Sequence, residues 1–313
     1  MAKGMFTQGV CLLTNGKTNI DDIESAFVGS DFEIVKKVPA QNDWRFGGPT
    51  LVIAYDPDVN GYAAIDVVDQ RWPDSMGDPK KDSITFGAWS MGHFGPYAFP
   101  GGLERAAQHC YAWEKGPAVA HAHRGFIRMS YAFGAKDSDP IMPADYDALA
   151  ELIFVTDIVL ALFPVAGVLC YFNPNGEVLR DKGEFRAMRK MCKEQKKTPL
   201  PLWMNVRYFQ VNQRFSLMDS VGNAQLDLRD VEAIFPQGDI DPNDIDYYVR
   251  NVSQYLIGHE LRDGDEIDGP GDTNLTWTIE VPEKAAAEPP RRVVRLYPKA
   301  HRREIRDALA AIR

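Results

Sequence analysis

The stretch LVIAYDPDVNGYAAIDVV, residues 51–68, decides the fold class of this 313-residue chain. Two nearly apolar segments, residues 51–55 and 62–68, flank a polar separator that ends in Asn60-Gly61, a pair typical of hairpin turns. Strands that face water on one side alternate apolar and polar residues, so segments this apolar indicate strands in the centre of a sheet. The stretch therefore predicts two consecutive strands, joined by a hairpin and buried within a sheet.

Further strands are predicted on both sides of this stretch, and several follow one another without a helix between them. The predicted strands cover residues 6–13, 32–38, 125–133, 165–172, 202–211, 214–218, 231–235, 275–281 and 292–297. The predicted helices cover residues 20–27, 103–113, 146–163, 184–195, 243–257 and 303–312. This order favours an α+β class, with mixed, largely antiparallel sheets and packed helices, over a strictly alternating parallel sheet.

The length of the chain predicts more than one compact part, because a domain typically holds about 100–200 residues. We expect two α+β lobes, residues 1–118 and residues 119–313. The first contains a long loop over residues 71–101 that is rich in aromatic and turn-forming residues. Irregular segments of that length are uncommon and often functional. The second lobe contains an acidic region, a flexible Ala/Glu/Pro-rich loop over residues 282–290, and a basic tail.

Charge is unevenly distributed along a chain whose net charge is −9. Residues 219–280 hold 15 acidic and 3 basic residues, a net charge of −12. Residues 288–313 hold 8 basic and 3 acidic residues, a net charge of +5. So acidic a chain is a poor binder of nucleic acid, because that binding neutralises phosphates with Lys and Arg. The pattern predicts either a negative surface that docks a basic protein, or a solvated face contacted by the tail.

Compartment signals favour a cytoplasmic protein. No apolar segment follows Lys3, as a secretory signal would require. The longest apolar stretch, residues 152–168, includes Asp157 and Pro164, whereas a membrane span needs about 20 nearly uncharged residues. The four cysteines form no Cys-x-x-Cys pair, which favours reduced thiols. We expect no membrane contact.

Two sets of residues are candidates for binding a partner protein. The acidic candidates are Asp239, Asp241, Asp244, Asp246, Asp263, Asp265, Glu266 and Asp268. The aromatic candidates are Trp72, Phe86 and Trp89, because large aromatic side chains dominate interface hot spots. Each set has a structural alternative. The acidic run from Asp239 lacks the Gly and Glu of a calcium loop and suits a turn and helix cap, and the aromatic loop suits a hydrophobic lid.

No recognisable catalytic motif occurs, so we predict no catalytic, cofactor-binding or metal-binding residues and no enzyme activity. The nucleophile elbow, phosphate-binding loop, dinucleotide fingerprint and His-Glu-x-x-His motif are all missing from the sequence. One alternative stays open. His121 and His123 would share one face of a strand, and zinc would need a third ligand, for which His93 and His109 are available.

One part of the chain resembles a bacterial domain of unknown function, the family numbered 4261. The resemblance rests on TPLPLWMNV at residues 198–206, SLMDSVG at residues 216–222 and DVE at residues 230–232. It extends over about residues 198–270. It implies a strand, a Gly-containing turn, a further strand and a helix, and it brings no established catalytic residues.

The whole chain more loosely resembles immunity proteins of type VI secretion and polymorphic toxin systems, in part through Trp44, the Trp89–Gly92 segment and Trp113. The resemblance implies a non-catalytic cytoplasmic protein that binds and neutralises a cognate secreted toxin or effector with a basic surface. In several such systems the toxin is a nuclease. The alternatives are a metal-dependent hydrolase that uses His121 and His123, and an adaptor that loads an effector onto a secretion apparatus.

Overall fold

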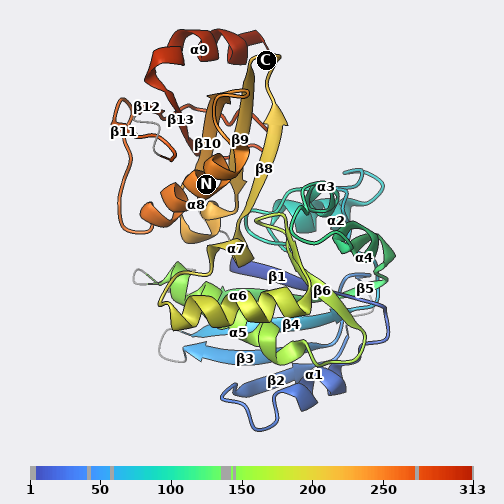
Figure 1. Ribbon diagram of the computed structural model, residues 1–313. Helices are drawn as coiled ribbons and strands as arrows, with labels where there is room; N and C mark the ends of the chain where they lie inside the picture. The colour runs from blue at the N-terminus through green and yellow to red at the C-terminus, as the bar shows by residue number, and fades with distance from the viewer. Residues whose placement is uncertain are drawn as a thin grey trace. The chain divides into compact units, whose positions relative to one another are not determined.

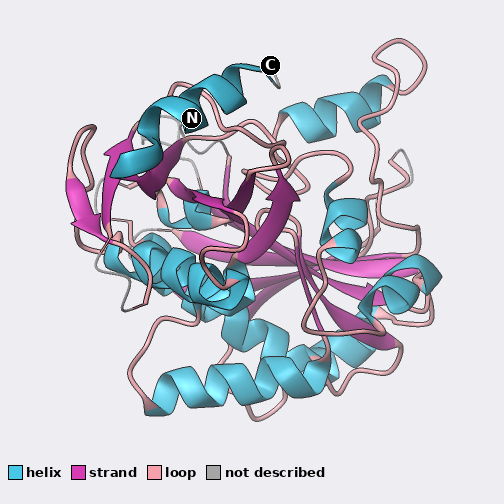
Figure 2. Ribbon diagram, turned by 45° about the horizontal axis from the view of Figure 1, so that its top comes forward, coloured by secondary structure: helices cyan, strands magenta, loops and turns pink. Residues whose placement is uncertain are grey.

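The structure, a computed structural model, describes residues 5–40, 44–56, 60–134, 142–143, 146–271 and 275–311. It divides the chain into two compact units, Met1–Leu202 (unit 1) and Trp203–Arg313 (unit 2), coloured blue to yellow-green and yellow to red in Figure 1. The described residues form a seven-stranded sheet in unit 1 and a six-stranded sheet in unit 2. Both sheets are mostly antiparallel and both units contain helices (Figure 2), which confirms the predicted α+β class.

The sheet of unit 1 has the strand order β2-β3-β4-β5-β1-β6-β7. Its strands are β1 (Phe6–Thr14), β2 (Ile34–Val38), β3 (Thr50–Asp56), β4 (Gly61–Val68), β5 (Gly125–Phe133), β6 (Val168–Asn173) and β7 (Val178–Arg180). The stretch over residues 51–68 forms β3 and β4, which pair antiparallel with Leu51 opposite Ile65. Asn60 has a φ of +53°, a value that Asn tolerates in turns. The predicted hairpin is therefore confirmed.

The division between the units lies after Leu202 rather than near residue 118, where the sequence had placed the lobe boundary. The reason is strand pairing. β5 lies between β4 and β1 and bonds to both, so the chain beyond residue 118 completes the first sheet instead of starting a second one. Local composition around residue 118 contains no signal of such long-range pairing.

Helices pack on the sheet of unit 1. They are α1 (Ile20–Ala26), α2 (Ser83–Ser90), α3 (Gly102–Gln108), α4 (Gly116–Ala122), α5 (Ala148–Leu162) and α6 (Lys182–Glu194), with the short α7 (Leu200–Trp203) at the junction of the units. Asp147 caps α5 by accepting from the N–H groups of Leu149 and Ala150. Gly116-Pro117 begins α4, because Pro suits the first helical turn.

The aromatic segment over residues 71–101 is a lid and contains the helix α2, so it is not an irregular loop throughout. The Trp72 ring lies edge-on against Phe94 at 5.4 Å, and against Phe126 and Phe172 at 5.3 Å between ring centroids. Trp89 is buried in the same core. Of the two interpretations that the sequence left open, the hydrophobic lid describes the position of these side chains.

Unit 2 places one helix on each face of its sheet, whose strand order is β11-β12-β13-β10-β9-β8. Its elements are β8 (Asn205–Gln210), β9 (Phe215–Val221), η2 (Asn223–Leu226), β10 (Asp230–Pro236), α8 (Pro242–Tyr255), β11 (Glu266–Asp268), β12 (Thr276–Glu280), β13 (Val293–Pro298), η3 (Lys299–His301) and α9 (Arg302–Ala311). The predicted last residue of α9, Ile312, lies outside the described residues. α8 packs on the face that carries Val231 and Ala233, and α9 packs on the face that carries Ile234.

Two further findings concern the thiols and the helices. Cys11, Cys110, Cys170 and Cys192 are free, and burial raises the pKa of each thiol. Over the described part of the chain, every helix is too short or too polar to cross a membrane.

Candidate functional site

Three carboxylates of the acidic region, those of Asp219, Asp230 and Glu232, are buried and paired with arginine. Arg207 donates through Nε and Nη2 to the two oxygens of Asp219, at 2.9 and 2.7 Å. Arg291 also donates to Asp219 and lies 3.5 Å from the carboxylate of Asp230. These partners precede or follow residues 219–280 in the sequence. The net charge of −12 counted there therefore overstates the charge of the surface, because part of it is neutralised inside unit 2.

The buried charges form a row across five strands of unit 2. On neighbouring strands Arg207 lies opposite Asp219, Asp219 opposite Glu232, Glu232 opposite Arg295, and Arg295 opposite Glu280. Residues that lie directly opposite one another place their side chains on the same face of a sheet, which explains why these charges meet. Burial of such charges is tolerated only because each is paired and hydrogen-bonded.

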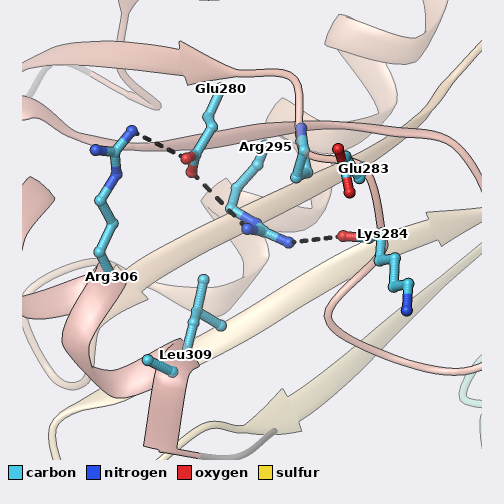
Figure 3. A pocket seen from close by; sticks show the side chains of 8 residues that line it. Glu280, Glu283, Lys284, Arg295, Arg306 and Leu309 are labelled. Atoms are coloured by element: carbon cyan, nitrogen blue, oxygen red, sulfur yellow. Dashed lines mark hydrogen bonds and ion pairs between the residues drawn. The ribbon is translucent and has the colours of Figure 1, made fainter.

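The row ends at an open pocket of about 600 Å³, shown in Figure 3. Glu280 lies between two guanidinium groups, 3.0 Å from Arg306 and 3.8 Å from Arg295. Arg295 also donates to Glu232 at 2.7 Å and to the backbone carbonyl of Lys284 at 3.4 Å. The two arginines and two glutamates neutralise one another, and their ion pairs link β10, β12 and β13 to α9.

Most of the exposed acidic candidates lie at two neighbouring places in unit 2. Asp239, Asp241 and Asp244 surround the start of α8, and Asp263, Asp265 and Asp268 surround β11; we call these six residues the acidic surface. The Tyr248 hydroxyl on α8 donates to the backbone carbonyl of Asp268 at 2.7 Å, which places the two groups side by side. Tertiary structure thus brings together residues that are about 25 positions apart in the sequence.

The acidic candidates differ in their partners. Asp246 pairs with Arg250 at 2.9 Å, and Glu266 pairs with Lys299 at 2.6 Å. Within the described ranges no ion pair reaches the six residues of the acidic surface. Three of the six also stabilise local structure by accepting backbone N–H groups, which is the turn and helix-cap role that the sequence had left open. They are Asp241, which caps α8, Asp263 and Asp265.

Two exposed tyrosines lie on α8, the helix that begins at the acidic surface, and the charge pattern of the sequence did not single them out. Tyr247 is 69% exposed and Tyr255 is 49% exposed. The opposite side of the helix, with Ile245 and Val249, is buried against the sheet. Tyr247 follows Asp244 by three residues and so lies on the same side of α8. The helical periodicity of residues 242–255 would have revealed these tyrosines, because they lie between the positions that face the core.

The aromatic candidates and the histidines lie in unit 1. Trp72 and Trp89 are buried and Phe86 is half-buried, so the two tryptophans are not available to a partner. His121 is exposed at the end of α4 and bonds to Glu104 at 3.0 Å. His123 is buried: its Nε2 accepts the backbone N–H of Trp72 at 2.9 Å, and its Nδ1 donates to the carbonyl of Ala120. Burial lowers the pKa of His123, in keeping with a neutral structural imidazole.

The described residues contain no group of three or more His, Cys, Asp or Glu that could hold a metal ion. His121 and His123 lie at the end of a helix rather than on a strand, so they do not share a face in the way the zinc alternative requires. Both ring nitrogens of His123 are already engaged. The geometry therefore provides no site at which this pair and a third ligand converge.

Unit 2 is thus a six-stranded α+β unit with one helix on each face and a row of buried ion pairs across its sheet. Residues 219–297 match the family model described as Domain of unknown function (DUF4261). The match confirms the family that the sequence indicated, although it lies later in the chain than the predicted range of 198–270. It covers about a quarter of the chain and includes Asp219, Arg295 and all six residues of the acidic surface. No curated protein and no solved structure matches the chain.

Proposed function

We propose that this chain is a non-catalytic cytoplasmic immunity protein, whose acidic surface binds and neutralises a toxin with a basic surface. One observation carries the proposal: among the described residues, carboxylates that no ion pair reaches lie at the start of α8, a helix that also exposes two tyrosines. Charged groups of one sign raise the association rate of an oppositely charged partner. Tyrosine supplies the apolar area and the hydroxyl group that dominate interface energetics. Because α8 is packed on a sheet, it holds the carboxylates and the tyrosines in a fixed arrangement.

The two alternative functions differ from this proposal in what they require. The hydrolase alternative needs His123 as a ligand or base, and His123 already bonds through both nitrogens in the core. The effector-loading adaptor would use the same acidic surface. It differs only in the fate of the partner, because an adaptor leaves the toxin active.

The test is growth protection. Each open reading frame next to the gene is expressed in a heterologous bacterial host, alone and together with this chain. We expect one neighbour to arrest growth and co-expression of the chain to restore it. A neighbour that binds the chain but still arrests growth would establish the adaptor instead. If no neighbour binds and none is neutralised, the proposal is wrong.

Charge reversal locates the surface. The double variant Asp244→Lys and Asp268→Lys should lose the rescue and lower the association rate at low salt by about tenfold or more. The matched control is Asp307→Lys, because Asp307 is an exposed acid of unit 2 on α9, the helix that covers the other sheet face. The double variant reverses two charges and the control reverses one. If surface plasmon resonance against the purified toxin shows that the control loses half as much as the double variant, the loss follows net charge alone and contradicts the assigned surface.

A further inference from the structure

A partly open cavity of about 190 Å³ lies on one face of the unit 1 sheet and is independent of the acidic surface. Its floor is formed by neighbouring strands, on which Thr50 lies opposite Asp66, Asp66 opposite Arg128, and Ala64 opposite Ser130. Small side chains at Ala64 and Ser130 leave room above the sheet. The cavity walls include Phe6, Trp44 and His93.

The charged groups in the floor are buried and form a neutral set. Arg128 is 3% exposed and donates through Nε and Nη2 to one oxygen of Asp66, at 2.9 and 2.7 Å. The other Asp66 oxygen accepts the hydroxyl of Thr50. Both carboxylate oxygens are therefore engaged. The positive and negative charges of the pair offset each other.

Three nitrogens on residues that line the cavity have no hydrogen-bond partner among the described residues. They are Nη1 of Arg128, Nε1 of Trp44 and Nε2 of His93. Arg128 and Trp44 offer only N–H donors at these atoms. Buried polar groups are nearly always satisfied in folded proteins, so the two unsatisfied donors on these lining residues favour an occupant that presents hydrogen-bond acceptors.

Charge and size restrict the partner further. Burial, reinforced by the nearby Arg128, lowers the pKa of His93 to about 3, so the imidazole is neutral. A second carboxylate would then leave an uncompensated negative charge beside Asp66, which is costly in a desolvated site. A volume of about 190 Å³ corresponds to about six water molecules, and an apolar cavity of roughly 150 Å³ holds one benzene ring. These two limits favour a neutral occupant about the size of one ring.

We propose that this cavity binds a small neutral molecule with a single ring, or of similar size, whose carbonyl-type oxygen accepts hydrogen bonds from Arg128 and Trp44. The aromatic walls would contact the ring. The Asp66–Thr50 contacts would keep Arg128 in place before the ligand arrives.

The test compares three probes that share one ring: benzamide, benzoate and benzylammonium. The full chain, labelled with ¹⁵N, contains six tryptophans, so the Trp44 indole resonance can be assigned by its loss in Trp44→Phe. We expect benzamide to shift the Trp44 indole N–H saturably and downfield. Benzoate and benzylammonium should bind at least about tenfold more weakly, because each leaves a buried charge unpaired.

Two variants and one control locate the ligand by saturation-transfer measurements on the benzamide signals. Trp44→Phe keeps the aromatic wall but removes one donor, and should weaken binding about fivefold. Ala64→Leu fills the cavity and should abolish binding. Trp113→Phe is the matched control: Trp113 packs against the same core but does not line the cavity, so its replacement should leave the affinity unchanged.

Each remaining outcome overturns the proposal. If no probe shifts the Trp44 indole, the cavity holds solvent only. If benzoate binds as tightly as benzamide, the ligand class is wrong. If benzamide binds equally to Trp44→Phe and wild type, it binds elsewhere. Should Ala64→Leu fail to fold, as seen from the loss of its other backbone resonances, the Trp44→Phe comparison still decides.

Discussion

The role and the pKa of each buried ionisable side chain in this protein depend on the hydrogen-bond and ion-pair partners that surround it. His123 has a partner at each ring nitrogen and serves as a core residue. His93 is largely buried beside Arg128, and its Nε2 has no partner in the described part of the chain. Asp219 lies between two arginines. Residue type alone would assign the two histidines the same properties, whereas their surroundings separate them.

Lowering the pH from about 7 to about 4 should destabilise unit 1 through His93. The folded pKa is about 3, whereas an unfolded histidine protonates near pH 6.5, so below pH 6.5 the unfolded state binds more protons. Stability is therefore lost as the pH falls from about 6.5 toward 3, by at most about 1.4 kcal/mol per pH unit. Urea denaturation at several pH values measures the slope. His93→Phe keeps the ring and should show a shallower slope; parallel slopes would contradict this prediction.

At the scale of elements, the segment between β12 and β13 has more contacts with the core than the sequence predicted. Residues 282–290 were predicted to be a flexible loop, but this segment lies over the buried charge row of unit 2. The backbone N–H of Ala286 donates to Glu232 at 2.6 Å, and Arg291 reaches Asp219. Ala286 and Ala287 pack against the core on the α9 side. An Ala/Glu/Pro-rich composition does not reveal that buried charges lie beneath it.

Asp219→Asn should destabilise unit 2 by about 3–5 kcal/mol, because it leaves Arg207 and Arg291 buried beside a neutral amide. Chemical denaturation followed by circular dichroism measures the change in the free energy of unfolding. Asp239→Asn makes the same chemical change at an exposed position that no ion pair reaches within the described part of the chain, and it should alter stability by less than about 0.5 kcal/mol. Similar effects of the two substitutions would mean that the charge row contributes little to stability.

At the scale of the whole molecule, each unit has its own sheet and core, so each is expected to unfold as its own cooperative transition. Leu12→Ala on β1 and Leu296→Ala on β13 remove fully buried leucines from unit 1 and unit 2 respectively. Each should cost about 2–5 kcal/mol in its own transition and leave the other unchanged. Denaturant titration with amide hydrogen exchange assigned to each unit distinguishes the two transitions. A single transition shifted by both variants would contradict independent unfolding.

Elements that local sequence determines could be predicted, whereas elements that depend on contacts between distant residues could not. Residues 51–68 and the apolar helix near residues 146–163 were predictable, because turn preference and local apolarity determine them. The short strands β7 and β11, three residues each, were missed because so few residues carry no periodicity.

The sequence by itself determined the α+β class and the family that residues 219–297 match, because these depend on local patterns. Only the tertiary structure decided which charges are exposed and which neutralise one another. It also decided where the chain divides and which polar groups surround the cavity at Arg128. The physical reason is that strand pairing joins residues far apart in sequence, such as Asp66 with Arg128 and Glu232 with Arg295, and burial then forces each charge to find a partner.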